Sequence, residues 1–185
     1  AEAGLGNQTG DTSEGINFFP AEVERYRNAV TLYCGQYQIE GYENLVLCVM
    51  FRESGGQGND PMASSESGYN TRFPREPLSI KDPLYSIDCG VHTLADAITA
   101  AGCTSPADFD HIALALQGYN FGNGYIQWAV DRDGGYTQEN AQAFSDMMKA
   151  KLGWEVYGNP GYAQVILADY LAILYGGDNG IILPG

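Results

Sequence analysis

The sequence predicts a single, mainly α-helical domain built around one fully buried central helix. Its 185 residues suit one hydrophobic core. Hydrophobic residues make up 44% of the chain and charged residues only 17%, which excludes a chain that is mostly disordered. Apolar residues recur every three or four positions in several segments, as they do on one face of a helix.

Helices are expected along most of residues 19–175, between a flexible leader at 1–18 and a loose tail at 176–185. The first begins at Pro20, which fits a first helical turn, and carries apolar side chains on one face. The buried helix starts near Tyr42 and contains the longest apolar run, Leu45 to Phe51, hydrophobic on every side. That run is also short enough for a strand, and we favour the helix.

Residues 54–84 show no period, and an irregular stretch of this length in a small domain is usually functional, so we expect it to line the substrate site. Helices follow at 85–101, ended by Gly102, and at 106–119, where Ser105 is the expected cap and Pro106 the first turn. The last three are expected at 124–131, at 138–152 between Thr137 and Gly153, and from Pro160, capped by Asn159, to Tyr175.

Charge and cysteine content exclude several classes of partner. Nine Lys and Arg against 23 Asp and Glu give a net charge of −14, which disfavours nucleic acid and anionic membranes. No apolar run approaches the roughly 20 residues that span a bilayer. The four cysteines form no Cys-x-x-Cys or Cys/His cluster, so neither a zinc site nor another cofactor is expected. Cys89 and Cys103 flank a predicted helix and lie too far apart to pair, while other pairings stay open.

Glu53 is the first candidate for a catalytic residue. It follows the apolar segment and precedes Ser54-Gly55-Gly56, where the chain leaves the core abruptly. Apolar surroundings and the negative end of a helix dipole both raise the pKa of a carboxyl, and a raised pKa suits a general acid. A charged residue that only marks a helix end is the alternative.

Three ordered motifs give the sequence a specific resemblance. It resembles the lysozyme-like domain of CwlT-type bifunctional cell-wall hydrolases, carried by conjugative transposons of Gram-positive bacteria, over roughly residues 20–170. More distantly, it is similar to soluble lytic transglycosylases and goose-type lysozymes. The segments that carry the resemblance are Met50-Phe51-Arg52-Glu53-Ser54-Gly55-Gly56-Gln57-Gly58-Asn59-Asp60-Pro61-Met62 with Ser64-Ser65-Glu66-Ser67, Tyr85-Ser86-Ile87-Asp88-Cys89-Gly90-Val91, and Ala115-Leu116-Gln117-Gly118-Tyr119-Asn120-Phe121-Gly122-Asn123-Gly124-Tyr125-Ile126.

The resemblance implies a lysozyme-like fold and hydrolysis of the β-1,4 bond between N-acetylmuramic acid and N-acetylglucosamine in peptidoglycan. It places the protein outside the cell at the wall of a Gram-positive bacterium, with a downstream peptidase domain as a partner. Glu53 matches the acid that protonates the glycosidic oxygen. The second carboxylate stays open among three residues, of which Asp60 is slightly favoured. The others are Glu66 and Asp88.

Four polar residues in the same motifs are expected to contact the glycan: Ser54, Gln117, Tyr119 and Asn120. The family pattern has Met-Gln where this chain has Met62-Ala63, so one amide is missing. Two alternatives to a muramidase therefore remain. One is a lytic transglycosylase, which uses the same acid but forms a 1,6-anhydro product, and the other is a peptidoglycan-binding module without activity.

Overall fold

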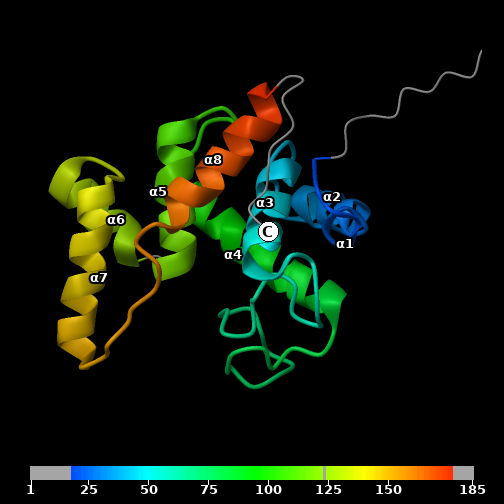
Figure 1. Cartoon of the computed structure of the whole chain (residues 1–185), viewed down its shortest axis with the longest axis horizontal. Coiled ribbons are helices and arrows are strands. Elements are labelled where there is room, and N and C mark those ends of the chain that lie inside the picture. Colours follow the sequence, from blue (N-terminus) through cyan, green and yellow to red (C-terminus); the bar gives the residue numbers. More distant parts are fainter. Residues whose placement is uncertain (1–17, 123, 177–185) are drawn as a thin grey trace, which may run out of the picture.

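The computed structural model describes residues 18–122 and 124–176, and every regular element in that part of the chain is an α-helix. The expected leader at 1–18 and tail at 176–185 lie almost wholly outside the described residues. In Figure 1, α6 and α7 lie on one side of the molecule and α1 and α2 on the other, with α5 and α8 between them. The prediction of a mainly helical fold is confirmed.

The first expected helix is divided in two, α1 (Ala21–Glu24) and α2 (Arg27–Gln36). The turn between them lets Arg25 donate a hydrogen bond of 2.9 Å to the carbonyl of Gly56. Gly56 is required there, since a Cβ would lie 2.3 Å from the carbonyl oxygen of Glu22. This contact fixes the start of the chain against the loop that follows the third helix.

The central helix, α3 (Glu43–Ser54), confirms the helical interpretation of the apolar run. Residues 45–50 are all completely buried, as all-round hydrophobicity predicts. The helix ends at Gly55, whose φ of 64° is the left-handed conformation of a glycine C-cap. Glu53 therefore lies in the last turn, where α3 leaves the core.

The next helix, α4 (Pro83–Ala101), crosses beneath α3 and starts two residues before the predicted position. Asp82 caps it by accepting hydrogen bonds from the backbone N–H groups of Leu84 and Tyr85. Gly90 is required by close packing, because a Cβ there would lie 2.6 Å from the Cβ of Met62. The irregular segment 55–82 is thereby held against α4.

The predicted start of the next helix is wrong, since α5 (Phe109–Phe121) begins after Asp108 rather than at Pro106. Thr104 donates from its backbone N–H and its hydroxyl to the Asp108 carboxylate, at 3.0 and 2.9 Å. These bonds close residues 104–108 into a turn, so Ser105 caps the turn instead of a helix. The end of α5 is two residues later than expected, at Phe121, so that Asn120 is helical as well as Tyr119.

The last three helices are α6 (Gly124–Asp133), α7 (Gln138–Leu152) and α8 (Tyr162–Tyr175). Both predicted bounds of α7 are confirmed, with Thr137 as N-cap and Gly153 as C-cap. The predicted start of α8 is wrong. Asn159 accepts a hydrogen bond from the N–H of Gly161 in a turn, and the helix begins only after it.

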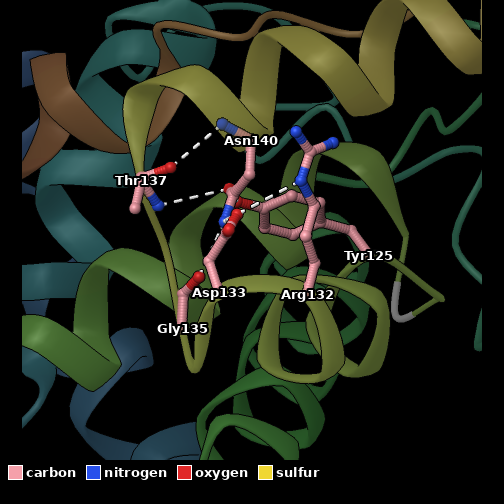
Figure 2. Close-up of polar contacts among 6 residues, drawn as sticks. All are labelled: Tyr125, Arg132, Asp133, Gly135, Thr137 and Asn140. Carbon is pink, nitrogen blue, oxygen red and sulfur yellow. Dashed lines mark hydrogen bonds and ion pairs between the residues drawn. The ribbon is translucent and has the colours of Figure 1, made fainter.

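A buried amide joins α6 to α7 (Figure 2). Asn140 is fully buried and donates to the carboxylate of Asp133 at 3.0 Å and to the carbonyl of Gly135 at 2.8 Å. Its carbonyl oxygen accepts from the Tyr125 hydroxyl at 2.6 Å and from the Thr137 N–H at 3.2 Å. The Asn140 side chain thus supplies hydrogen-bond partners to four polar groups of α6 and of the turn that leads to α7.

All four cysteines are free, and all but Cys103 are fully buried. Burial raises the pKa of both Cys34 and Cys103 to about 12, so these thiols stay protonated near neutral pH. The cysteines therefore act as packing side chains.

Candidate active site

Glu53 lies half-buried at the end of α3, beside the first residue of α8. The Tyr162 hydroxyl donates a hydrogen bond of 2.5 Å to Oε1 of Glu53. Burial raises the pKa of Glu53, the bond from Tyr162 lowers it, and the negative charge of Asp60 raises it again. The net effect is upward, so Glu53 holds its proton at a higher pH than a free glutamate.

Three cavities meet the side chain of Glu53, with volumes of about 650, 410 and 320 Å³. The largest is bounded by the loop after α3 on one side and by the end of α5 on the other. Its polar and aromatic lining includes Glu66, Ser67, Thr93, Tyr119, Asn120 and Tyr157. A carboxyl group with a raised pKa therefore opens into a long polar cavity, which is the arrangement expected of an active site.

Asp60 is enclosed by the loop that it organises. It is 4% exposed, and its carboxylate accepts hydrogen bonds from the backbone N–H groups of Ser64 and Ser65 at 2.9 and 3.2 Å. The hydroxyls of Ser65 and Ser86 donate to it at 2.5 and 2.6 Å. None of the ion pairs in the described part of the chain includes Asp60. We call this group, Asp60 with Ser64, Ser65 and Ser86, the Asp60 cluster.

Two predicted glycan contacts also hold the protein together. Gln117 is fully buried; it donates to the carbonyl of Asn159 at 2.9 Å and accepts from the N–H of Ala163. Ser54 donates to the carbonyl of Pro61 at 2.7 Å and accepts from the N–H of Gly56. The Gln117 amide is thus bonded to α8 and the turn before it, and Ser54 folds the loop back onto α3; a glycan contact of either residue stays a prediction.

Asp88 lies away from these cavities. It is on α4 and accepts a hydrogen bond from the Tyr37 hydroxyl, on the side of the helix that packs against α2. None of the three cavities beside Glu53 includes it. The motif that contains Asp88 is helical, and it meets the loop of the site through other residues, among them Tyr85, Ser86 and Gly90.

Tyr119 and Asn120 lie in the last turn of α5 and line the largest cavity, close to Glu53. The Tyr119 hydroxyl donates to the carbonyl of Met62 at 3.2 Å, and its ring stacks near Tyr162 with centroids 6.3 Å apart. The side-chain oxygen of Asn120 accepts from the N–H of Asn159 at 2.7 Å, and the residue lines the same cavity. These two residues connect the loop after α3 with the loop before α8.

Glu66 and Ala63 form part of the wall opposite α5. Glu66 is exposed and lines the largest cavity beside Glu53, whereas Asp60 is buried and lines only the cavity of about 410 Å³. Ala63 is exposed too and has a φ of 47°, a left-handed conformation that costs a non-glycine residue energy. The position where the family has an amide therefore lies in the cavity wall.

Sequence reasoning missed Tyr162, which makes the closest polar contact to Glu53. The two residues are 109 positions apart in the chain, so no local pattern connects them. Tyr157 was missed for the same reason, although it lines the largest cavity. The nearest signal was the expected cap at Asn159, which placed a helix start at Pro160, two residues before Tyr162.

The described residues contain neither a group of metal ligands nor a membrane-spanning helix. No group of three or more His, Cys, Asp or Glu side chains in residues 18–122 and 124–176 is arranged to hold a metal ion. No helix in that part of the chain is both long and apolar enough to cross a membrane.

Comparisons with known proteins agree with this geometry. The chain is 34% identical over 146 residues to the bifunctional muramidase/DL-endopeptidase CwlT of Bacillus subtilis (strain 168), covering 79% of this chain and 41% of CwlT. It is 31% identical over 128 residues to the pneumococcal vaccine antigen A homolog of Streptococcus pyogenes serotype M1, covering 69% of this chain and 60% of that protein. The chain thus spans about half the length of such relatives.

A solved structure and a family match point the same way. The crystal structure of a protein similar to lipoprotein, of the NLP/P60 family, from Staphylococcus aureus subsp. aureus Mu50 superposes with a TM-score of 0.68 at 29% identity, covering 84% of this chain and 54% of that chain. Residues 20–179 match the lysozyme-like family. The resemblance seen in the motifs is confirmed, and the chain belongs to the lysozyme-like family.

Proposed function

We propose that this protein is a peptidoglycan hydrolase that cleaves the β-1,4 bond between N-acetylmuramic acid and N-acetylglucosamine. The observation that carries the proposal is Glu53, a carboxyl group with a raised pKa that opens into a polar cavity of about 650 Å³. The muramidase named in its CwlT relative supports the same bond. Such an activity belongs at the bacterial wall outside the cell, and in a longer chain a peptidase domain would act beside it.

In this mechanism Glu53 is the general acid. Its proton passes to the glycosidic oxygen as the bond to the anomeric carbon breaks, and an oxocarbenium-like sugar develops. Tyr162 fixes the orientation of the carboxyl through Oε1. The charge of Asp60 keeps the proton on Glu53 until the substrate takes it.

Asp60 and Glu66 share the roles that were expected of a single second carboxylate. Asp60, the residue favoured from the sequence, accepts hydrogen bonds on both oxygens and is 4% exposed, so we assign it to holding the loop and raising the pKa of Glu53. Glu66 is exposed in the same cavity and is the better placed of the two to orient a water molecule. Replacement of Glu66 by Gln tests that assignment.

Digestion of purified peptidoglycan by the parent and by Glu53→Gln tests the proposal. Loss of a general acid lowers the rate by roughly 10²–10⁴-fold. Glu43→Gln is a matched control, because Glu43 lies at the opposite end of the same helix and away from the three cavities. Equal rates for the parent and Glu53→Gln would refute the role of Glu53.

The released fragments distinguish the alternatives. Muramic acid ends that borohydride reduces indicate hydrolysis, whereas 1,6-anhydro ends indicate a lytic transglycosylase with the same acid. Ala63 is the observation that favours a binding module, because it removes an amide from the cavity wall. Retained affinity with no fragments from the parent would establish that module, and Ala63→Gln would then be expected to restore cleavage.

A further inference from the structure

The loop 153–161, which joins α7 to α8, carries an unusual amount of exposed apolar surface. Trp154 is 58% exposed and Val156 is 72% exposed, and Leu152 just before them is 41% exposed. A contiguous apolar patch at a surface often marks a binding site, whereas a single exposed apolar side chain needs no explanation. Of the aromatic side chains in the described part of the chain, only Trp154 and Tyr175 are more than half exposed, and Trp154 lies among further exposed apolar residues.

This apolar surface lies beside a residue of the cavity that Glu53 lines. Tyr157 lines that cavity, and the Trp154 ring lies 6.2 Å from the Tyr157 ring at an interplanar angle of 33°. The two rings are therefore neighbours, one inside the cavity and the other just outside it. We call Trp154 and Val156 the rim platform.

The rim platform is rigidly mounted. The Tyr157 hydroxyl donates to the carbonyl of Phe121 at 2.8 Å, and Ser145 donates to the carbonyl of Tyr157 at 2.7 Å. The N–H of Trp154 donates to the carbonyl of Lys149 at 3.1 Å, which ties it to the last turn of α7. These bonds hold Tyr157 and the backbone of Trp154, and a backbone that is already ordered loses less conformational entropy on binding.

We propose that the rim platform binds sugar rings of the glycan strand that lie beyond the bond cleaved beside Glu53. This inference rests on the proposed function. A pyranose ring has an apolar C–H face that an aromatic ring can cover, while its hydroxyl groups stay in water. Trp154 is the neighbour of Tyr157, which lines the cavity that holds Glu53, so a strand that leaves the cavity past Tyr157 would meet Trp154 next.

The test measures affinity against glycan length in the Glu53→Gln background, so that the ligand is not cleaved. The ligands are soluble, peptide-free oligosaccharides of alternating N-acetylglucosamine and N-acetylmuramic acid. We expect Trp154→Ala to weaken the binding of long oligosaccharides roughly three- to tenfold, by the usual size of an aromatic contact, and to leave the shortest ligand unaffected. Tyr175→Ala is a matched control, since Tyr175 is 68% exposed at the far end of α8.

Fluorescence gives a second readout. The chain has two tryptophans, and Trp128 packs against Phe144 with ring centroids 5.1 Å apart. In Trp128→Phe, Trp154 is the single reporter, and its emission should change with long oligosaccharides only. Equal affinities of Trp154→Ala and its parent at every length would overturn the platform alone. Failure of every oligosaccharide to bind, together with no digestion by the parent, would overturn the proposed function as well.

A second copy of the chain or a protein partner is the competing occupant. Sedimentation at increasing concentration, with and without Trp154→Ala, decides this point. A dimer that forms in the parent and is lost in the variant would overturn the assignment to glycan. A monomer in both, with the length-dependent loss of affinity, supports it.

Discussion

Asp60 and Asn140 are two buried side chains that each organise a turn, but they lie in different parts of the molecule and carry different charge. Asn140 is neutral and both donates and accepts, so a single amide satisfies the connection between α6 and α7 (Figure 2). Asp60 is an acceptor only, and every partner in its cluster is a donor. The charged group lies beside Glu53 and raises its pKa, whereas the neutral group lines none of the cavities there.

Both side chains hold a turn in place, but only Asp60 also acts on the proposed active site. A neutral amide suffices where the fold alone must be held. A buried carboxylate is more costly to desolvate, and the site gains a nearby negative charge in return. The isosteric substitutions Asn140→Asp and Asp60→Asn therefore separate the requirements of the fold from those of the site.

Asn140→Asp should have the largest effect on stability. The introduced carboxylate would face the carbonyl of Gly135 and the carboxylate of Asp133, with no donor in place of the lost amide. An unpaired buried charge costs about 3–5 kcal/mol in the free energy of unfolding. Urea unfolding measures the loss, which should shrink as the pH falls toward about 4 and be absent below it, where the carboxyl is protonated in both states.

Activity provides the control for that variant. The fraction of Asn140→Asp that remains folded should cleave at the parent rate, because Asn140 lines none of the cavities beside Glu53. A rate per folded molecule that falls with stability would contradict the separation of the two regions.

Asp60→Asn should cost about 2–4 kcal/mol, because the new amide N–H groups face donors and leave at least one buried donor without an acceptor. The partners at risk are the N–H and hydroxyl of Ser65 or the groups of Ser64 and Ser86. Unlike the change at Asn140, this one should also lower the activity of the folded fraction. Removal of the negative charge lowers the pKa of Glu53, so the loss should be greatest at the alkaline end of the pH profile.

Tyr162→Phe tests the same carboxyl from the other side. Its hydroxyl bond lowers the pKa of Glu53, so its removal should raise that pKa further. A general acid works while protonated, and activity falls as the pH rises through its pKa. The alkaline limb of kcat/KM should therefore move to higher pH in Tyr162→Phe and to lower pH in Asp60→Asn. Movement of both limbs in one direction would contradict the assigned causes.

Much of this fold follows from local sequence, and the errors lie where several polar residues compete. The buried helix of residues 43–54 follows from its hydrophobic run, and Thr137 and Gly153 mark the exact bounds of α7. At the start of α5, Ser105 is the cap expected from the sequence, but the bonds from Thr104 to the Asp108 carboxylate close a turn, and the helix begins three residues later than predicted.

The site is predicted only in part, for a related reason. Glu53 stands out because the chain changes from apolar to glycine-rich within two residues, and this change is visible locally. Gln117 belongs to a matching motif, yet its amide is buried against α8. Tyr162 reaches Glu53 only through the packing of α8 on α3, and no spacing in the sequence encodes that contact.

Ala63→Gly should have the smallest effect and the opposite sign. Ala63 and Leu78, two of the three non-glycine residues with positive φ in the described part of the chain, both lie in the loop after α3. Glycine relieves a strain of about 1–2 kcal/mol but loses about 0.5–1 kcal/mol in backbone entropy, so a net gain of about 0.5–1 kcal/mol is expected. Ala107→Gly is the control, because Ala107 is an exposed turn residue without positive φ and should be destabilised or unchanged. A gain at Ala63 alone, measured by urea unfolding, would place stored strain in the wall of the site, and equal effects at both alanines would argue against it.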